Sequence, residues 1–195
     1  MREQPQHAGR RGNANHPHPV GITVILASAL ALSACGFQLR GGNPAPDALQ
    51  PLYVACGAGV PEAFCTTLTR HLRDAGVVLA DDGANHARLQ VNSLDEDRRT
   101  TAITATAAAA EYDLRLRTRI SLFAPSGTPL VADDAVIASQ TYRYDETNVV
   151  AKRREETELR TQLYRQLAEQ LLFRLGPWDA ARIASIEAAT PPAKP

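Results

Sequence analysis

The amino-acid sequence predicts an α+β fold: a two-layer sandwich with two helices packed on one face of a mostly antiparallel, mixed four-stranded sheet. Over residues 110–123 apolar and polar side chains alternate with a period of two, which is typical of a strand with one face on a core. Over residues 148–175 leucines recur every four residues, as in a helix that buries one face. The predicted order of strand, helix, three strands and helix allows both helices to cover the same sheet face.

The first half of the domain contains a strand, a helix and a second strand. LYVAC at 52–56 is a short apolar strand, and ARLQVNSL at 87–94 is an alternating one. Between them, Pro61 and Glu62 begin a helix that Gly76 ends. The apolar stripe of this helix consists of Phe64, Leu68, Leu72 and Ala75.

The second half contains the longest elements. On strand 110–123 the core face carries Tyr112, Leu114, Leu116, Thr118, Ile120 and Leu122, and the other face carries Asp113, Arg115, Arg117 and Arg119. A turn at 125–129 leads to a returning strand at 136–144. The long helix ends at Gly176-Pro177, and residues 178–188 favour a further short helix. We expect 52–188 to form a single domain and 189–195 a disordered tail.

The N-terminus has the pattern of an exported protein. Three arginines precede an uncharged run at 20–32, which is too short to span a bilayer because a spanning helix needs about 20 apolar residues. Leu32-Ser33-Ala34 then leads directly to Cys35, which resembles the signal of bacterial lipoproteins, with a cysteine that accepts lipid. Residues 1–34 are therefore predicted to be a lipoprotein signal peptide and 35–51 a lipidated N-terminus with a Gly/Pro-rich tether. A plain signal peptide followed by an unmodified cysteine is the alternative.

Composition limits the function classes. Cleavage before Cys35 would leave 161 residues with 18 basic and 20 acidic side chains, so the overall charge does not favour nucleic-acid binding. Cys56 and Cys65 remain as a pair in an oxidising compartment, where a turn between strand and helix allows a disulfide. Two buried thiols are the alternative interpretation.

The sequence offers little material for catalysis. Only His71 and His86 follow the predicted signal, and no cluster has metal-ligand spacing. The acidic pairs Asp81-Asp82 and Asp133-Asp134 lie in turn-like stretches, where solvated loop charges are the simpler interpretation. We therefore expect a binding or assembly protein that is not an enzyme and has no catalytic residues, no cofactor and no metal.

Three segments in order resemble the lipopolysaccharide-assembly lipoprotein family (LptE). They are CGFQLRG from Cys35, AEYDLRL from Ala110, and QLYRQLAEQLLFRL within the long helix. The resemblance implies an outer-membrane, lipid-anchored, periplasm-facing protein that plugs the β-barrel of the lipopolysaccharide translocon (LptD), assists its assembly and binds lipopolysaccharide. A periplasm-facing scaffold or transporter accessory without this ligand is the alternative, and a lipid-anchored hydrolase is a weaker one.

The resemblance also implies where the ligand binds. The family's basic contact before the long helix matches Lys152, with Arg153 and Arg154 adjoining it. Lys and Arg suit this role because lipid A phosphates are anionic. A second basic contact of the family falls on Ala105 here, and we expect Arg98 or Arg99 to substitute for it. Read without the resemblance, the triplet is a solvated helix start paired with nearby glutamates.

Overall fold

A computed structural model describes residues 45–144 and 149–190 of the chain. The chain separates into two units, 1–41 and 42–195, and every described residue lies in the second. The predicted signal peptide, Cys35 and residues 191–195 of the predicted tail lie outside the described residues.

The order of elements confirms the predicted fold class. A four-stranded sheet is built from β1 (Leu52–Cys56), β2 (Ala87–Ile103), β3 (Ala109–Phe123) and β4 (Pro129–Arg143) in that spatial order. The pair β1–β2 is parallel, while β2–β3 and β3–β4 are antiparallel. The helices are α2 (Glu62–Asp74), α3 (Val149–Leu175) and α4 (Ala180–Ala189), and a short 3₁₀ helix, η1 (Asp47–Leu49), precedes β1.

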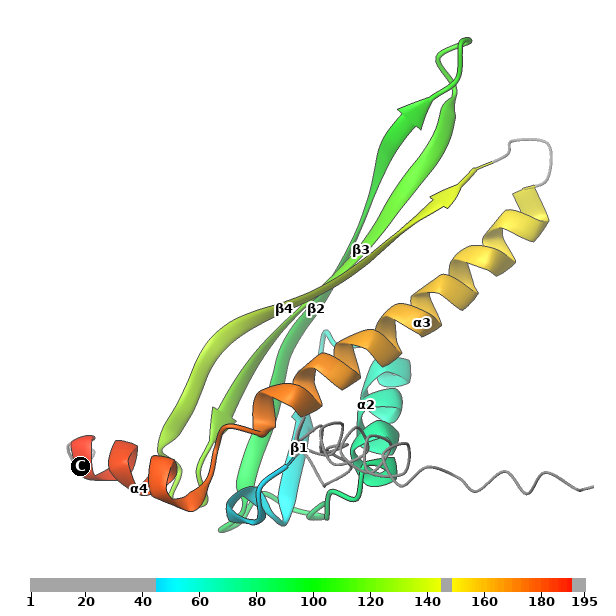
Figure 1. The fold of residues 1–195 in the computed structure, drawn as a ribbon. Helices are drawn as coiled ribbons and strands as arrows, with labels where there is room; N and C mark the ends of the chain where they lie inside the picture. Colours follow the sequence, from blue (N-terminus) through cyan, green and yellow to red (C-terminus); the bar gives the residue numbers. More distant parts are fainter. Residues whose placement is uncertain (1–44, 145–148, 191–195) are drawn as a thin grey trace, which may run out of the picture. The chain divides into compact units, whose positions relative to one another are not determined.

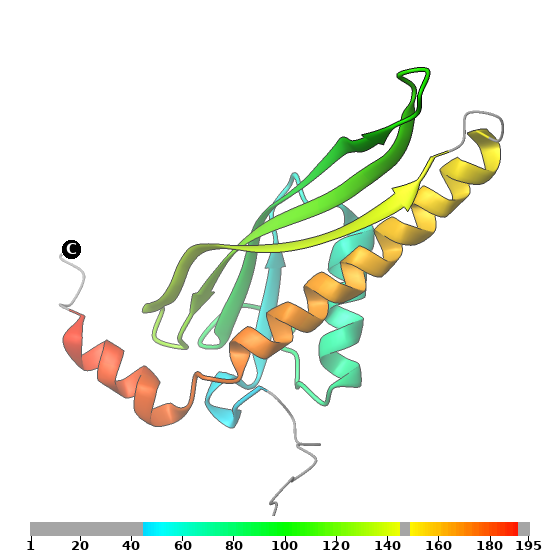
Figure 2. The same ribbon diagram turned by 45° about the horizontal axis from the view of Figure 1, so that its top comes forward.

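The core lies between one sheet face and the two longer helices. Figures 1 and 2 show α2 and α3 on the same side of the sheet, with α3 running along β3 and β4. From β3 the alternating residues Leu114, Leu116, Thr118, Ile120 and Leu122 are buried, and from α3 the four-residue series Leu163, Leu167, Leu171 and Leu175 is buried. Arg115 and Arg117 on the opposite face of β3 are exposed. The two sequence periodicities thus meet in one apolar layer.

Two strands extend beyond their predicted ranges. The strand predicted at 87–94 continues to Ile103 as β2, and the strand predicted at 136–144 begins at Pro129 as β4. Both extensions pair with β3 despite irregularities in register, one beside Ser121 where Asp133 has a positive φ of 48°. Backbone pairing supports these segments although their side chains do not alternate cleanly between apolar and polar.

The segment before β1 also differs from its prediction. Within the tether expected at 35–51, Ala45 and Leu49 are buried in the core, and the Gln50 side chain donates to the Ala45 carbonyl at 3.0 Å. The apolar side chains of APDAL dock on the domain, so residues 45–51 belong to the fold rather than to a free linker.

A disulfide joins the end of β1 to the first turn of α2. Cys56 and Cys65 are linked, with their Cα atoms 6.5 Å apart. The turn between them brings the helix over the sheet edge, and Phe64 beside Cys65 is fully buried against the Tyr164 ring of α3. The link lies where α2 enters the core.

Candidate functional site

The basic triplet Lys152, Arg153 and Arg154 lies in the first turns of α3. The Lys152 Nζ donates to a Glu155 carboxylate oxygen at 2.7 Å, and its side chain is only 21% exposed. Arg153 and Arg154 are exposed, and within the described residues neither makes an ion pair. The triplet therefore presents one half-buried, paired ammonium beside two guanidinium groups that face solvent.

Arg98 lies close to the triplet across the helix–sheet boundary. Its guanidinium makes an ion pair of 3.1 Å with Glu156 and lies 4.7 Å from the centre of the Tyr112 ring. Glu156 is four residues after Lys152, so both project from the same side of α3. The structure thus brings Arg98 to the helix side that carries Lys152.

Arg99 lies on the other face of the sheet, because successive side chains of a strand alternate. Its Nε donates to Asp97 at 2.5 Å, and both side chains border a shallow hollow with Asp95, Arg115 and Arg117. Arg98 and Arg99 therefore cannot act as one contact on the same surface. Of the two expected substitutes, only Arg98 faces α3.

The β2–β3 hairpin tip contains Ala105 but no basic side chain. The Thr104 amide donates to the Ala108 carbonyl at 2.7 Å, and Ala107 has a positive φ of 62°. In Figure 1 this tip lies beyond the point where α3 begins. Arg98 pairs with Leu114 inside the ladder, so it does not occupy the position of the family's tip contact.

A network of charged groups supports the surface beneath the triplet. Glu156 accepts hydrogen bonds from Tyr142 at 2.9 Å, Arg98 at 3.1 Å and Arg160 at 3.2 Å. Arg160 also binds both carboxylate oxygens of Glu96, at 2.6 and 2.7 Å. The network connects β2, β4 and α3 at the end of the apolar core.

Three pKa values within this network are raised, and that of the Arg98 guanidinium is raised mainly by its hydrogen bond with Tyr142. Burial raises the pKa of the Tyr142 phenol, and its hydrogen bond to Glu156 adds to the effect. The hydrogen bonds to Glu96 raise the pKa of Arg160. Sequence reasoning missed Tyr142 and Arg160, although the four-residue spacing of Glu156 and Arg160 indicates a helix ion pair.

Other classes of site receive no support from the described part of the chain. Across 45–144 and 149–190, no group of three His, Cys, Asp or Glu side chains is arranged to hold a metal ion. No helix among these residues is both long enough and apolar enough to cross a membrane. Asp133 lies in the irregular part of β4, where it accepts from the Arg119 Nε at 2.9 Å.

Comparison with known proteins decides the family. The sequence model of LptE, described as lipopolysaccharide-assembly, matches residues 49–175, which span β1 to the end of α3. The chain belongs to the LptE family. The matched range includes the basic triplet and Arg98, whereas α4 lies outside it.

Individual LptE proteins align with most of the chain. An LPS-assembly lipoprotein LptE of Pectobacterium atrosepticum is 30% identical over 160 residues, covering 79% of this chain and 84% of that protein. One from Yersinia pestis is 26% identical over 171 residues, covering 85% and 80%. The LptE family is non-enzymatic, in agreement with the expectation of an assembly protein.

Solved structures share the LptE fold. Lipoprotein B of Nitrosomonas europaea superposes with a TM-score of 0.61 at 18% identity, covering 78% of this chain and 96% of that one. A minor lipoprotein of Acinetobacter baumannii gives 0.55 at 21% identity, covering 66% and 92%. At these identities the likeness concerns the fold alone.

Proposed function

We propose that the protein is an outer-membrane lipoprotein that assembles with the LptD barrel, plugs it, and binds lipopolysaccharide during delivery to the cell surface. The observation that carries the proposal is the LptE match over residues 49–175, which includes nearly the whole described domain. Lipid attachment at Cys35 would hold the domain at the periplasmic side of the membrane.

The ligand contact is proposed at the basic triplet, with Lys152 first and Arg98 beside it. The phosphates of lipid A are anionic, and charge-assisted hydrogen bonds from ammonium and guanidinium groups bind such oxygens well. Arg153 and Arg154 are exposed and can meet a phosphate directly. Lys152 would exchange its Glu155 partner for the ligand or share its donors between the two.

The test is a charge reversal, Lys152→Asp, in the full lipidated chain. One charge-assisted contact contributes roughly 1.5–3 kcal/mol, so lipopolysaccharide affinity should fall about tenfold or more. The melting temperature should stay nearly unchanged, because a partly exposed ion pair contributes about 0–1 kcal/mol. Arg165→Asp, at an exposed position on the same helix, is the matched control.

Barrel assembly is measured on the same variants by co-purification with LptD from native outer membranes. We expect stoichiometric LptD with the wild type and with both variants. Unchanged lipopolysaccharide affinity in correctly folded Lys152→Asp would remove this residue from the ligand site. Loss of LptD with Lys152→Asp alone would move the triplet to the barrel interface, and absence of LptD from the wild-type preparation would contradict the plug role.

A further inference from the structure

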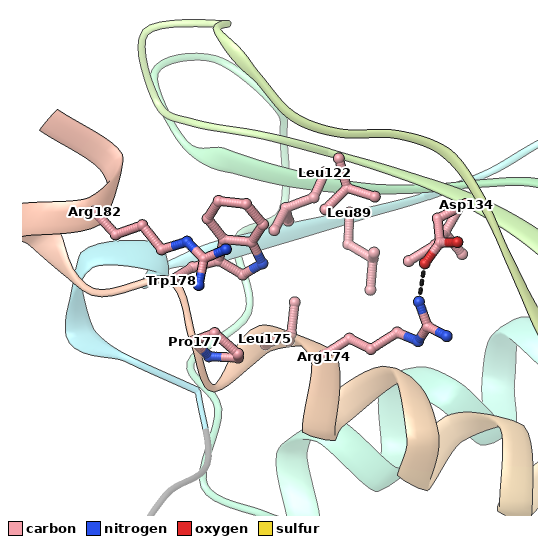
Figure 3. A pocket seen from close by; sticks show the side chains of 10 residues that line it. Leu89, Leu122, Asp134, Arg174, Leu175, Pro177, Trp178 and Arg182 are labelled. Atoms are coloured by element: carbon pink, nitrogen blue, oxygen red, sulfur yellow. Dashed lines mark ion pairs between the residues drawn. The ribbon is translucent and has the colours of Figure 1, made fainter. Parts of the chain in front are cut away.

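A cavity of about 270 Å³ lies between the sheet and the connection from α3 to α4. Figure 3 shows Leu89 and Leu122 of the sheet on one side, and Leu175, Pro177 and Trp178 on the other. Leu89, Leu122 and Leu175 are at most 1% exposed, so the walls belong to the rigid core. The cavity is therefore a built feature of the fold rather than a gap between mobile surface side chains.

The C-terminal segment closes this cavity and lies beyond the residues that the LptE family model matches. Pro177, Trp178 and Arg182 follow the matched range, which ends at residue 175. Ile183 buries α4 against the core, and the Ser126 hydroxyl donates to Glu187 at 2.5 Å. These contacts hold α4 against the β3–β4 turn. The cavity thus depends on residues that the proposed family function does not use.

The two arginines that line the cavity, Arg174 and Arg182, differ in their interaction partners. Arg174 makes an ion pair with Asp134 across the opening, as Figure 3 shows, which neutralises both groups. The Arg182 guanidinium lies 4.5 Å from the centre of the Trp178 ring, and within the described residues no carboxylate pairs with it. Its N–H groups remain available beside apolar walls. This combination suits a ligand with an aliphatic body and an anionic end.

We propose that this cavity binds a single aliphatic chain with an anionic head group, held by Arg182. Its volume of about 270 Å³ equals roughly nine groups of water size at about 30 Å³ each, and a methylene is of similar size. A chain of roughly eight to ten carbons therefore fills it. A free fatty acid and one chain of an anionic phospholipid share this chemistry.

The experiment uses Trp178, the only tryptophan of the chain, as the reporter. The full lipidated protein in nanodiscs is titrated with hexanoate, octanoate, decanoate and dodecanoate, and its fluorescence is recorded. We expect affinity to rise roughly fourfold per added methylene and to level off near ten carbons, where the cavity is full. Decanol tests the head group and should bind at least tenfold more weakly than decanoate.

Two variants separate the proposal from adsorption to the bilayer. Arg182→Gln should weaken decanoate binding about tenfold and leave decanol unchanged. Val131→Phe fills the cavity from β4 and should abolish the response to both ligands, while Arg165→Gln, an exposed arginine elsewhere on α3, should resemble the wild type. Melting temperatures confirm that each variant is folded.

Two outcomes overturn the proposal. The first is affinity that rises with chain length without levelling off and is the same in folded Val131→Phe. The second is equal binding of decanoate and decanol, which would remove the anionic head group from the proposal. Displacement of decanoate by dioctanoyl phosphatidylglycerol supports the proposal and assigns the chain to a phospholipid, whereas decanoate binding without such displacement assigns it to a free fatty acid.

Discussion

Glu156 accepts hydrogen bonds from side chains of three elements: Arg98 of β2, Tyr142 of β4 and Arg160 of α3. Its own side chain is 22% exposed, so water screens these bonds incompletely. Removing its charge would leave two guanidinium groups with fewer acceptors in a partly desolvated position. We therefore expect Glu156 to contribute more to stability than a solvated carboxylate on the same charged helix face.

We expect Glu156→Gln to lower the free energy of unfolding by about 1–2 kcal/mol, because hydrogen bonds to charged groups weaken but the amide still accepts. Urea unfolding at neutral pH measures the change. Glu158→Gln is the control, since Glu158 is an exposed carboxylate two residues away with no such contact in the described residues. Equal values for the two variants would show that the network contributes no more than a solvated charge.

The raised pKa of Tyr142 predicts a pH dependence. An ordinary tyrosine has a pKa of about 10, and the folded protein keeps Tyr142 neutral above that value. The unfolded chain ionises first, so this contribution to stability is complete below about pH 10 and is lost as pH rises through the folded pKa.

Tyr142→Phe cannot titrate and should change this behaviour. At pH 8 the variant should be about 1 kcal/mol less stable than the wild type, because it lacks the hydrogen bond to Glu156. The difference in stability between the variant and the wild type should be smaller at pH 11 than at pH 8, because the wild type loses the contribution of neutral Tyr142 as pH rises. Burial also raises the pKa of Tyr164. Because Tyr164 is present in both proteins, its effect on stability cancels in the comparison. Urea unfolding at the two pH values gives the comparison, and a constant difference would contradict the prediction.

At the scale of elements, apolar periodicity predicted which residues of the strands and helices pack in the core. It did not predict the parts of the strands that extend beyond the core. Beyond Leu94 the helix-facing positions of β2 include Glu96 and Arg98, which form hydrogen bonds with Arg160 and Glu156 of α3 instead of packing against leucines. A strand with polar side chains on both faces shows no alternation of apolar and polar residues, so the sequence pattern does not indicate it as a strand. Only the tertiary pairing with β3 defines its length.

The link between β1 and α2 gives a prediction at the same scale. Replacing Cys56 and Cys65 together by alanine should lower the free energy of unfolding by about 2–4 kcal/mol, since the cross-link restricts the unfolded chain. Non-reducing peptide mapping of protein alkylated during extraction should find the two cysteines joined. Free thiols at both positions, or equal stability of the double variant, would exclude a structural role for the bond.

At the scale of the whole molecule, the family resemblance points to Lys152 as a candidate ligand contact, but the sequence could not predict the surroundings of this residue. Arg98 and Arg99 are neighbours in the chain, and only the register of β2 decides that one faces α3 and the other the open sheet face. The cavity beside Trp178 was equally out of reach, because its walls come from β2, β3, β4 and the α3–α4 connection. Such sites depend on long-range packing, which a local pattern does not encode.

Attachment to the membrane is the last property of the whole molecule, and the prediction concerns Cys35. The apolar run at 20–32 and the small residues before Cys35 indicate cleavage at this point, with acyl chains on the new N-terminus. Each buried methylene contributes about 0.8 kcal/mol, and one chain gives only marginal binding, so two or more are needed for a stable anchor.

Intact-mass measurement of the wild type should therefore find a chain that starts at Cys35 and carries lipid. Cys35→Ala should leave an unprocessed, unlipidated chain, because no thiol is present to accept the lipid. Ser28→Ala, inside the same apolar run but away from the cleavage point, is the matched control and should be processed normally. A mature wild-type chain that starts elsewhere, or an unmodified Cys35, would contradict the lipid anchor and leave the plain signal peptide as the interpretation.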